Sequence, residues 1–338
     1  MKKKPVVAIV GATGLVGREM LHVLEQRNFP LESLRLFASG RSAGEKLEFR
    51  GGALVVENLA TASFRGIDIV LASAGAKVSE IFAPKAVSEG AVVIDNSSAF
   101  RMNPDVPLVV PEVNKEKAFE HKGIIANPNC STIQLVVVLW PIYKAFGLKR
   151  VIVSTYQAVS GAGKKAMDEL ISQIVSVLNH RPVSIEKLPH QIAFNLLPHI
   201  DAFEENGYTK EEMKLVRETR KITGLHGLCI TATCVRVPVL NGHSESVVLD
   251  LEEDARPSDI RSVLEKAPGV KVLDDPEEFE YPMPLLISGK DEVFVGRIRK
   301  DPCVEKSVSL WICADNLRKG AALNAVQIAE VLLEKGIG

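Results

Sequence analysis

The first third of the chain alternates short apolar runs with segments whose apolar residues recur at helical spacing. Val6–Val10 is the first such run, and the segment Leu15–Gln26 that follows it carries its apolar residues on one helical face. Further short apolar runs follow at 34–37, 67–71, 91–94 and 123–126, with helix-like stretches such as 77–88 between some of them. This alternation predicts a parallel sheet with helical crossovers.

The pattern changes after about residue 128. A helix-like segment, 131–146, leads to apolar runs that are longer and closer together, at 150–159, 228–237 and 245–251. The turn signal Asn241-Gly242 lies between the last two runs, so we expect them to pair as an antiparallel hairpin. The amphipathic segment 317–334 predicts a final helix that packs back on the first domain.

These patterns predict two domains, and a length of 338 residues exceeds the usual size of one compact core. The predicted fold class is α/β. A Rossmann-like parallel-sheet domain comprises residues 1–128 together with 316–338, and a second domain of α+β type comprises 129–315.

The charge balance and the cysteines exclude several classes of protein. Lysine and arginine number 41 against 42 aspartates and glutamates, and a net charge of -1 gives no overall attraction to nucleic acid or to an anionic membrane. The longest apolar run, 135–140, is too short to span a bilayer. Five cysteines without a C-x-x-C pair suit neither a disulfide framework nor a zinc site, so we expect no metal and a reducing, cytoplasmic location.

A glycine-rich turn joins the first apolar run to the first helix. Its glycines follow the spacing G-x-x-G-x-x-G, a variant of the dinucleotide fingerprint. Glycine lets the backbone approach a pyrophosphate, and the helix N-terminus supplies amides and a favourable dipole. We therefore interpret the turn as a cofactor site rather than as a plain tight turn between strand and helix. The residues assigned to it are Gly11, Thr13, Gly14, Leu15, Val16 and Gly17.

The second apolar run, 34–37, ends where an NAD-binding protein usually carries an acidic residue for the ribose hydroxyls. Here the run leads into Ala-Ser-Gly-Arg-Ser, with no carboxylate. Arg41 and the hydroxyls of Ser39 and Ser42 suit a 2′-phosphate, which favours NADP over NAD. The alternative is an exposed loop arginine that binds nothing.

Cys130 is the cysteine whose position indicates chemistry. It follows an apolar run and precedes the helix-like segment 131–146, so it lies in or just before the first helical turn, where a thiolate is favoured. Three other cysteines, Cys229, Cys234 and Cys313, lie in strand-like runs and are expected to be small buried side chains. A thiolate beside a nicotinamide suits oxidation of an aldehyde to a thioester. The acyl group of that thioester is then transferred either to water or to phosphate.

Six segments of the chain are similar to the aspartate-semialdehyde dehydrogenase family, in the family's order and nearly from end to end. They are 11–17, 95–101, 127–132, 157–163, 236–239 with 242–245, and 296–299. The resemblance implies an NADP-dependent, phosphorylating aldehyde dehydrogenase that uses a Cys130 thioester. Its reductive direction converts L-aspartyl-4-phosphate to L-aspartate 4-semialdehyde and phosphate, toward diaminopimelate and lysine, threonine and methionine. The resemblance also implies a homodimer or a dimer of dimers, associated through the sheet of the second domain.

By this resemblance Cys130 is the nucleophile, and His243 is the acid/base that shuttles the proton as the hemithioacetal forms and collapses. The Asn-Gly turn places His243 at the tip of the expected hairpin, an exposed position where a histidine titrates near its ordinary pKa. Without the resemblance, a solvated loop histidine would be the preferred interpretation.

The resemblance assigns the remaining site residues. Gln157 orients the substrate, and Ser160, Gly161 and Asn316 contact the nicotinamide end of the cofactor. Arg236 binds the α-carboxylate of the substrate, for which a bidentate guanidinium is well suited. Arg101 and Lys214 bind phosphate, and Glu211 binds the substrate amino group. For Glu211 and Lys214, spacing alone favours a solvated ion pair on a charge-rich helix.

Two other functions stay open at this point. The first is N-acetyl-glutamyl-phosphate reductase, which shares the architecture and the thioester chemistry but usually differs after the Asn-Pro pair that precedes Cys130. The second is a catalytically silent relative that serves as a binding module. Such relatives tend to lose the cysteine or the histidine, and this chain has both.

Overall fold

The computed structural model describes residues 4–335, which form two compact units. The first unit ends at Asn129 and takes up the chain again from Ala321, and the second runs from Cys130 to Gly320. The segment 321–335 thus belongs to the first unit although it comes last in the sequence. Within residues 4–335, none of the helices combines the length and the apolarity needed to cross a membrane.

The first unit is built on a seven-stranded sheet in the order β3-β4-β2-β1-β5-β6-β7. All neighbouring strands are parallel except β3 and β4, which form an antiparallel edge. The chain adds β2 and β4 on one side of β1 and then crosses to β5 on the other, so the carboxyl end of β1 is the point where ligands bind in such sheets. The strands are β1 (Val6–Val10), β2 (Ser33–Ala38), β3 (Lys46–Phe49), β4 (Gly52–Asn58), β5 (Ile69–Ala72), β6 (Val92–Asp95) and β7 (Ile124–Ala126).

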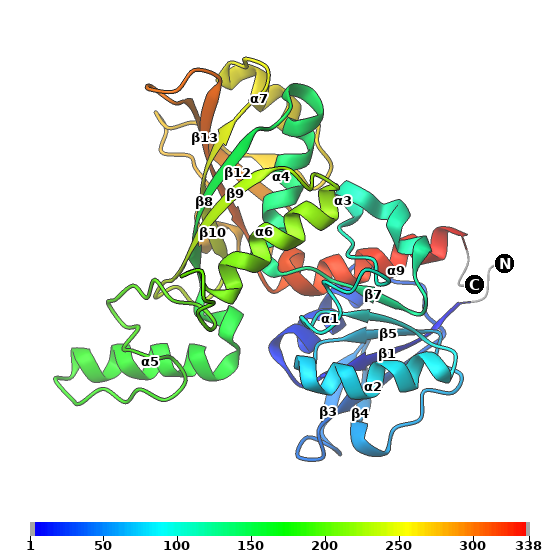
Figure 1. Ribbon diagram of the computed structural model, residues 1–338. Coiled ribbons are helices and arrows are strands. Elements are labelled where there is room, and N and C mark those ends of the chain that lie inside the picture. The colour runs from blue at the N-terminus through cyan, green and yellow to red at the C-terminus, as the bar shows by residue number, and fades with distance from the viewer. Residues whose placement is uncertain (1–3, 336–338) are drawn as a thin grey trace. The chain divides into compact units, whose positions relative to one another are not determined.

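Helices cover both faces of this sheet. Alternate residues of the central strands pack on α2 (Ala76–Ser88) on one face, and the residues between them pack on α1 (Leu15–Gln26) and α9 (Leu323–Lys335) on the other. Figure 1 shows α2 and α9 on opposite sides of β1 and β5. This arrangement confirms the predicted Rossmann-like domain and the return of the final helix to it. The short helices of the unit are η1 (Leu59–Thr61), α3 (Pro111–Asn114) and η2 (Lys115–Glu120).

The sequence pattern missed the edge hairpin of β3 and β4. Each of these strands exposes much of its surface, and β3 alternates charged with apolar residues, whereas the apolar run Ala-Leu-Val-Val within β4 was overlooked. Arg50 and Gly51 form the turn between them, with φ of 50° and 75°, as a two-residue hairpin turn requires. The last helix also starts later than predicted, at Leu323, because η4 (Arg318–Ala322), a π-helical turn, precedes it.

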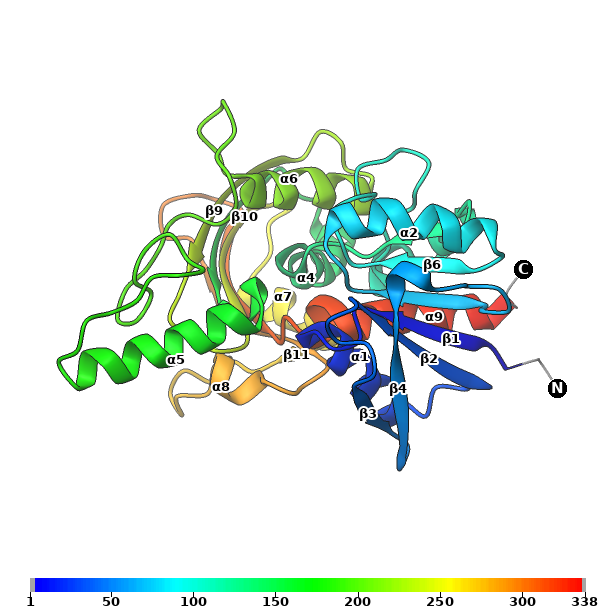
Figure 2. The same cartoon turned by 90° about the horizontal axis from the view of Figure 1, so that it is seen from below.

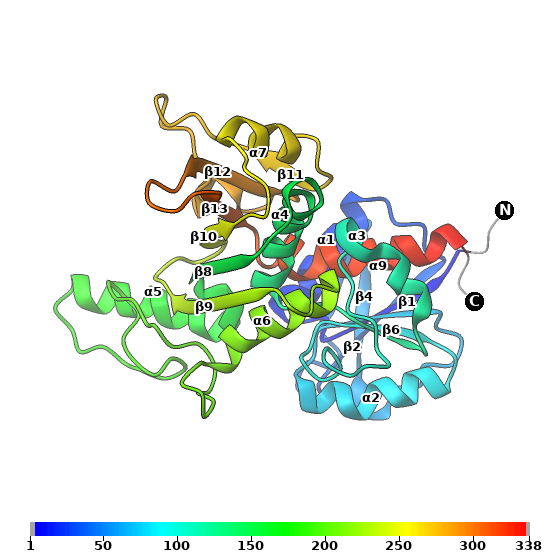
Figure 3. The ribbon, with the colours of Figure 1, turned by 45° about the horizontal axis from the view of Figure 1, so that its top comes forward.

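The second unit is built on a six-stranded sheet in the order β11-β12-β13-β10-β8-β9. One face packs against α4 (Cys130–Phe146), α6 (Lys210–Thr223) and α7 (Pro257–Leu264), and Figure 3 shows α6 running beside β9. The strands are β8 (Arg150–Gln157), β9 (Cys229–Arg236), β10 (His243–Asp250), β11 (Val270–Val272), β12 (Val293–Lys300) and β13 (Ser307–Ala314). The mixed sheet and its helices confirm the α+β second domain.

The predicted hairpin between the second and third long runs was wrong. β8 lies between them, parallel to β9 and antiparallel to β10. After β9 the chain crosses the end of β8, where the amide of Val159 donates to the carbonyl of Val239 at 2.9 Å. The Asn241-Gly242 turn therefore delivers β10 to the far edge of β8 instead of folding it back on β9.

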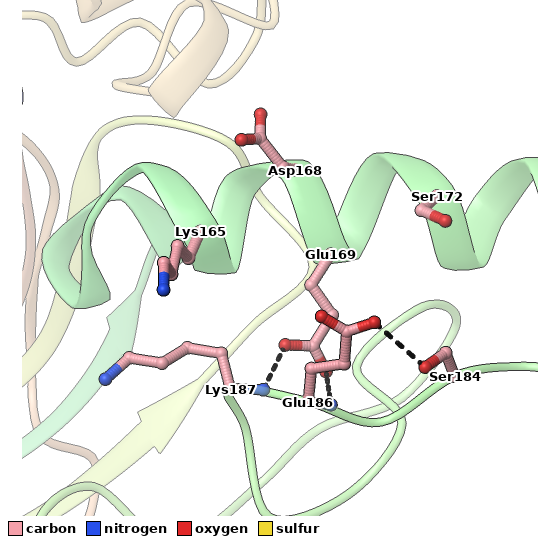
Figure 4. Close-up of a pocket in the computed structure, with 7 residues that line it drawn as sticks. All are labelled: Lys165, Asp168, Glu169, Ser172, Ser184, Glu186 and Lys187. Atoms are coloured by element: carbon pink, nitrogen blue, oxygen red, sulfur yellow. Dashed lines mark hydrogen bonds between the residues drawn. The ribbon is translucent and has the colours of Figure 1, made fainter.

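An arm formed by α5 (Lys164–Leu178) and the following loop extends from this unit, as Figure 2 shows. The Glu169 carboxylate, only 8% exposed, holds the loop by accepting the main-chain amides of Lys187 at 2.7 Å and Glu186 at 3.2 Å. A cavity of about 470 Å³ lies between helix and loop (Figure 4). Because Glu169 is committed to the loop, we assign the cavity no ligand. The remaining short helices of the unit are η3 (Val159–Ala162) and α8 (Pro284–Ile287).

Candidate active site

Cys130 is the first residue of α4, and its side chain is half-buried. The first turn of the helix is Cys-Ser-Thr-Ile, without a carboxylate, so the field at the helix N-terminus favours a thiolate there. A Cβ added at Gly320 would lie 3.0 Å from the Cβ of Cys130. The glycine therefore leaves room beside the thiol.

The other cysteines are placed differently. Cys234 and Cys313 are fully buried, and burial raises the pKa of Cys234 far above its usual value and that of Cys313 to about 12. Cys229 and Cys303 are exposed. We expected Cys229 to be buried, which was wrong because it is the first residue of the edge strand β9. Of the five thiols, Cys130 is the one that begins a helix.

Arg236 and His243 meet beside Gly161. A Cβ added at Gly161 would lie 3.1 Å from both Nη1 of Arg236 and Nε2 of His243. Gly161 itself is exposed, whereas Arg236 and His243 are 6% and 0% exposed. Burial lowers the pKa of Arg236, and attraction to Glu211 and to Cys130 opposes that effect. The guanidinium is therefore electrostatically coupled to the thiol.

His243 is fully buried, with its two ring nitrogens in different environments. Nδ1 accepts a hydrogen bond from the amide of Ala158 at 3.1 Å, whereas Nε2 has no hydrogen-bond partner among the described residues. The neutral ring therefore carries its proton on Nε2. Burial, and then the charge of Arg236, lowers the pKa of His243 well below 6.5. The expected exposed histidine with an ordinary pKa was wrong, because His243 begins β10 inside the sheet, opposite Ala314.

Gln157, Glu211 and Lys214 form a connected polar group. Nε2 of Gln157 donates to Oε1 of Glu211 at 3.3 Å, and Lys214 donates to Oε2 of Glu211 at 3.1 Å and to Asp201 at 2.7 Å. Burial lowers the pKa of Lys214, but attraction to Glu211 and Asp201 outweighs it and raises the pKa overall. Glu211 is only 5% exposed, so the pair is not the solvated surface bridge that helical spacing alone favours.

Ser160 and Asn316 hold the turn that precedes His243. Nδ2 of Asn316 donates to Oγ of Ser160 at 2.9 Å, and Oδ1 of Asn316 accepts the amide of Gly242 at 2.9 Å. Oγ of Ser160 donates to Oδ1 of Asn241 at 3.1 Å. Both predicted residues therefore lie at the same end of the sheet as His243, and Gly161 follows directly.

The glycine turn in the first unit joins β1 to α1 and fits a pyrophosphate. Gly11 has φ +82°, and a Cβ there would lie 2.3 Å from the carbonyl oxygen of Ser73, so only glycine is accommodated. A Cβ at Gly17 would lie 2.2 Å from the oxygen of Gly11. Gly14 precedes α1 without a capping side chain, and the first turn, Leu15-Val16-Gly17-Arg18, lacks a carboxylate. The amides that start α1 are thus available to an anion.

The loop after β2 lies beside this turn. Oγ1 of Thr13 donates to Oγ of Ser42 at 3.3 Å, and the amide of Ser42 donates to the carbonyl of Ser39 at 2.9 Å. Ser39 and Arg41 are exposed on the resulting tight turn. The first unit therefore brings a cation and two hydroxyls next to the glycine turn, which fits a phosphorylated ribose.

Arg101 belongs to the first unit and is only 8% exposed. Nε donates to the carbonyl of Asn127 at 2.9 Å, and Nη2 donates to the carbonyl of Asn96 at 2.7 Å. These carbonyls follow β7 and β6, so Arg101 ties together the two segments that leave the sheet. The guanidinium is anchored rather than solvated.

Sequence reasoning missed the residues that support these side chains. Ala158 orients His243 through its main-chain amide, and no sequence motif of side chains predicts a main-chain contact. Asn324 donates to Oδ1 of Asn127 at 2.6 Å and to the carbonyl of Val109 at 3.0 Å. Asn324 lies in the final helix, so only a structure brings it to the segment that precedes Cys130.

Sequence comparison matches both units to known domains. Residues 6–121 match the semialdehyde dehydrogenase NAD binding domain, and residues 139–319 match the semialdehyde dehydrogenase dimerisation domain. The aspartate-semialdehyde dehydrogenase of Aquifex aeolicus is 58% identical over 335 residues, covering 98% of each chain. That of Bacillus subtilis is 54% identical over 334 residues, covering 96% of each.

Solved structures give the same result. The crystal structure of aspartate semialdehyde dehydrogenase II from Vibrio cholerae complexed with ASA superimposes with a TM-score of 0.96 at 46% identity, covering 98% of this chain and 99% of that one. An aspartate semialdehyde dehydrogenase from Candida albicans with NADP gives 0.76 at 28% identity, covering 99% and 100%. The fold, the thiol at the start of α4 and these matches agree: the chain belongs to the aspartate-semialdehyde dehydrogenase family.

Proposed function

We propose that this chain interconverts L-aspartyl-4-phosphate and L-aspartate 4-semialdehyde, with NADP as cofactor, through a thioester on Cys130. In the reductive direction the Cys130 thiolate attacks the acyl carbon, and the C–O bond to phosphate breaks. The thioester is then reduced to a hemithioacetal alkoxide, whose C–S bond breaks to release the semialdehyde and restore the thiolate. The observation that carries the proposal is geometric: Cys130 begins α4, where a thiolate is favoured, and Arg236 and His243 meet beside Gly161 in the same unit.

The first unit binds the cofactor. The glycine turn and the start of α1 would hold the pyrophosphate, and Arg41 with Ser39 and Ser42 would hold the 2′-phosphate. When bound, the nicotinamide exchanges a hydride with the acyl carbon. Ser160, Gly161 and Asn316 would meet that end of the cofactor.

His243 acts on the reacting oxygen through Nε2. Because Nδ1 is occupied by the amide of Ala158, the neutral ring presents its Nε2 hydrogen to the site. A neutral imidazole stabilises a developing oxyanion by hydrogen bonding without becoming charged. We thus refine the predicted acid/base role: His243 is the donor that stabilises the hemithioacetal oxygen as it forms and collapses.

Side chains of the second unit would bind the charged α-carboxylate and α-amino groups of the substrate. Arg236 would bind the α-carboxylate, since it is anchored by its bond to the carbonyl of Ala158 at 2.7 Å and keeps other guanidinium donors. Glu211, oriented by Gln157, would bind the α-amino group. Arg101 and Lys214 are each proposed to bind phosphate, and at Lys214 the phosphate would compete with Asp201 for the ammonium group.

We further propose a homodimer or a dimer of dimers, formed through the open face of the second unit's sheet. That face, opposite α4 and α6, carries half-buried side chains including Ile152, Tyr156 and Trp311, with the two aromatic rings 5.3 Å apart. The match to a dimerisation domain supports this. Light scattering at micromolar concentration should give at least twice 36.8 kDa, and a monomer mass would contradict it.

A cytoplasmic location also stays part of the proposal, since five free thiols suit a reducing compartment.

The test is an oxidation assay with aspartate semialdehyde. Purified protein with NADP should form NADPH only when inorganic phosphate is present, and Cys130→Ala should abolish turnover. Cys303→Ala, at an exposed cysteine, is the matched control and should retain full activity. Turnover by Cys130→Ala would exclude the thioester. A preference for N-acetyl-glutamate semialdehyde would instead favour N-acetyl-glutamyl-phosphate reductase.

A further inference from the structure

Two buried polar side chains in the second unit have no role in the reaction described above. Glu245 in β10 is 0% exposed and Gln134 in α4 is 1% exposed. Among the described residues, neither carboxylate oxygen of Glu245 and neither polar atom of the Gln134 amide completes a hydrogen bond of normal geometry. Burying such groups without partners is costly, so their presence calls for a functional explanation.

Their positions relate them to the reacting groups. Gln134 follows Cys130 by one helical turn, so both project from the same face of α4. Glu245 follows His243 by two residues in β10, so both project from the same face of the sheet. Gln134 is buried on α4, which packs on this sheet, and Glu245 belongs to the fully buried positions of β10, so both side chains lie in the layer between helix and sheet. An interaction with Gln134 lowers the pKa of Glu245 against the larger effect of burial. They form a polar layer beneath Cys130 and His243.

The neighbouring strands extend the same layer. Thr155 lies opposite Glu245 and Cys234 lies opposite Thr155 in the strand register. Thr155 precedes Gln157 by two residues, and Cys234 precedes Arg236 by two. Four buried side chains thus form one layer next to the reacting and binding residues. Gln134 lies next to Cys130, Glu245 next to His243, Thr155 next to Gln157 and Cys234 next to Arg236, and each of the four is uncharged or protonated.

The charge of Glu245 decides what this layer does. Burial raises its pKa well above 4.5, so the folded protein holds it as a neutral acid. Among the described residues, Glu245 acts electrostatically on the thiols of Cys234 in β9 and Cys313 in β13, whose pKa values are both raised, chiefly by burial. Glu211 and Glu212 of α6 act on the same Cys234 thiol. An anion beneath the site would oppose a Cys130 thiolate, whereas a neutral pair does not.

We propose that Glu245 and Gln134 are positioning residues for the thioester reaction, an uncharged pair that sets the placement of His243 on β10 relative to Cys130 at the start of α4. The proposal rests on the function proposed above. Neither residue touches substrate, and each acts through the side chain above it. Supporting residues of this kind affect the rate because a displacement of about 1 Å in a reacting group costs roughly 100-fold.

The test compares two replacements of nearly equal size. Glu245→Gln keeps a neutral polar group and should retain kcat within about 3-fold, whereas Glu245→Met removes the polar group and should lower kcat by about 10- to 100-fold with little change in KM. The second readout is the pH dependence of Cys130 alkylation by iodoacetamide, which needs no substrate. It should match the wild type in Glu245→Gln and differ in Glu245→Met.

The controls keep the outcomes distinct. Ser307→Ala removes another buried, unpartnered polar atom at the far end of β13 and should change neither readout. If Glu245→Met does not fold, Gln134→Met makes the same test. The proposal is overturned if Glu245→Gln loses as much activity as Glu245→Met, or if Glu245→Met behaves as wild type. Activity in Cys130→Ala would overturn the proposed function, while the alkylation readout on the wild-type thiol would still test the positioning.

Discussion

The main-chain amide of Ala158 donates a hydrogen bond to Nδ1 of His243 at 3.1 Å. The bond fixes the proton of the neutral ring on Nε2, and burial beside Arg236 lowers the pKa of the imidazole well below 6.5. A buried histidine that is neutral at neutral pH acts there as a hydrogen-bond donor.

This relationship predicts that His243 does not titrate near neutral pH. In protein with ¹³C-labelled histidine, the ring signal that disappears in His243→Asn should show no transition centred near pH 6.5, because burial and the charge of Arg236 lower its pKa well below that value. A shift of that signal with a midpoint near 6.5 would show that the ring protonates, and the donor role would then be wrong.

Gly161 should tolerate no side chain. In Gly161→Ala the new methyl group would lie 3.1 Å from Nη1 of Arg236 and Nε2 of His243, so kcat/KM should fall by about 10- to 100-fold through misplacement of these groups. Gly227→Ala is the matched control, because its Cβ would meet open space. Full activity in Gly161→Ala would mean that this side of the site is not used.

Much of the first unit was predictable because its buried strands are continuous apolar runs between clear turns. The prediction for 15–26 matches α1 residue for residue. Failures occurred where pairing depends on distant segments. The Asn241-Gly242 signal is real, with Gly242 at φ +91°, but nothing local indicates that β8, far earlier in the chain, would lie between β9 and β10.

The sequence predicted which residues form the site but not how deeply each of them is buried. Helix position singled out Cys130, and resemblance supplied the roles of Arg236, Gln157 and Glu211. No sequence pattern predicts that His243 is fully buried, since a histidine after an Asn-Gly turn has the appearance of a loop residue. Glu245 escaped notice for a related reason: a glutamate in a strand is ordinarily exposed, and its burial follows from the sheet register.

Arg41 should set the choice of cofactor. Loss of charge-assisted hydrogen bonds to a 2′-phosphate costs about 1.5 to 3 kcal/mol, so Arg41→Ala should raise KM for NADP by about 10- to 100-fold and leave KM for NAD nearly unchanged. Arg65→Ala, at another exposed arginine of the first unit, should alter neither constant. A wild-type preference for NAD would contradict the assignment of Arg41.

Glu245 should make stability depend on pH in a defined direction. Its pKa is raised in the folded state, so its contribution to stability is complete below about pH 4.5 and is lost as the pH rises toward the raised value. Glu245→Gln does not titrate. The difference in Tm, variant minus wild type, should therefore grow from about pH 5 to about pH 8, while that of Ser307→Ala should stay constant. A difference that shrinks with pH would mean that Glu245 is ionised in the folded protein.

The thioester on Cys130 is the central claim, and omission of phosphate isolates it. Protein mixed with aspartate semialdehyde and NADP, without phosphate, should form about one equivalent of NADPH per subunit and then slow down. Mass spectrometry of the quenched protein should find one β-aspartyl group on the peptide that contains Cys130, and added phosphate should remove it. Steady turnover without phosphate and without an adduct on Cys130 would contradict the account.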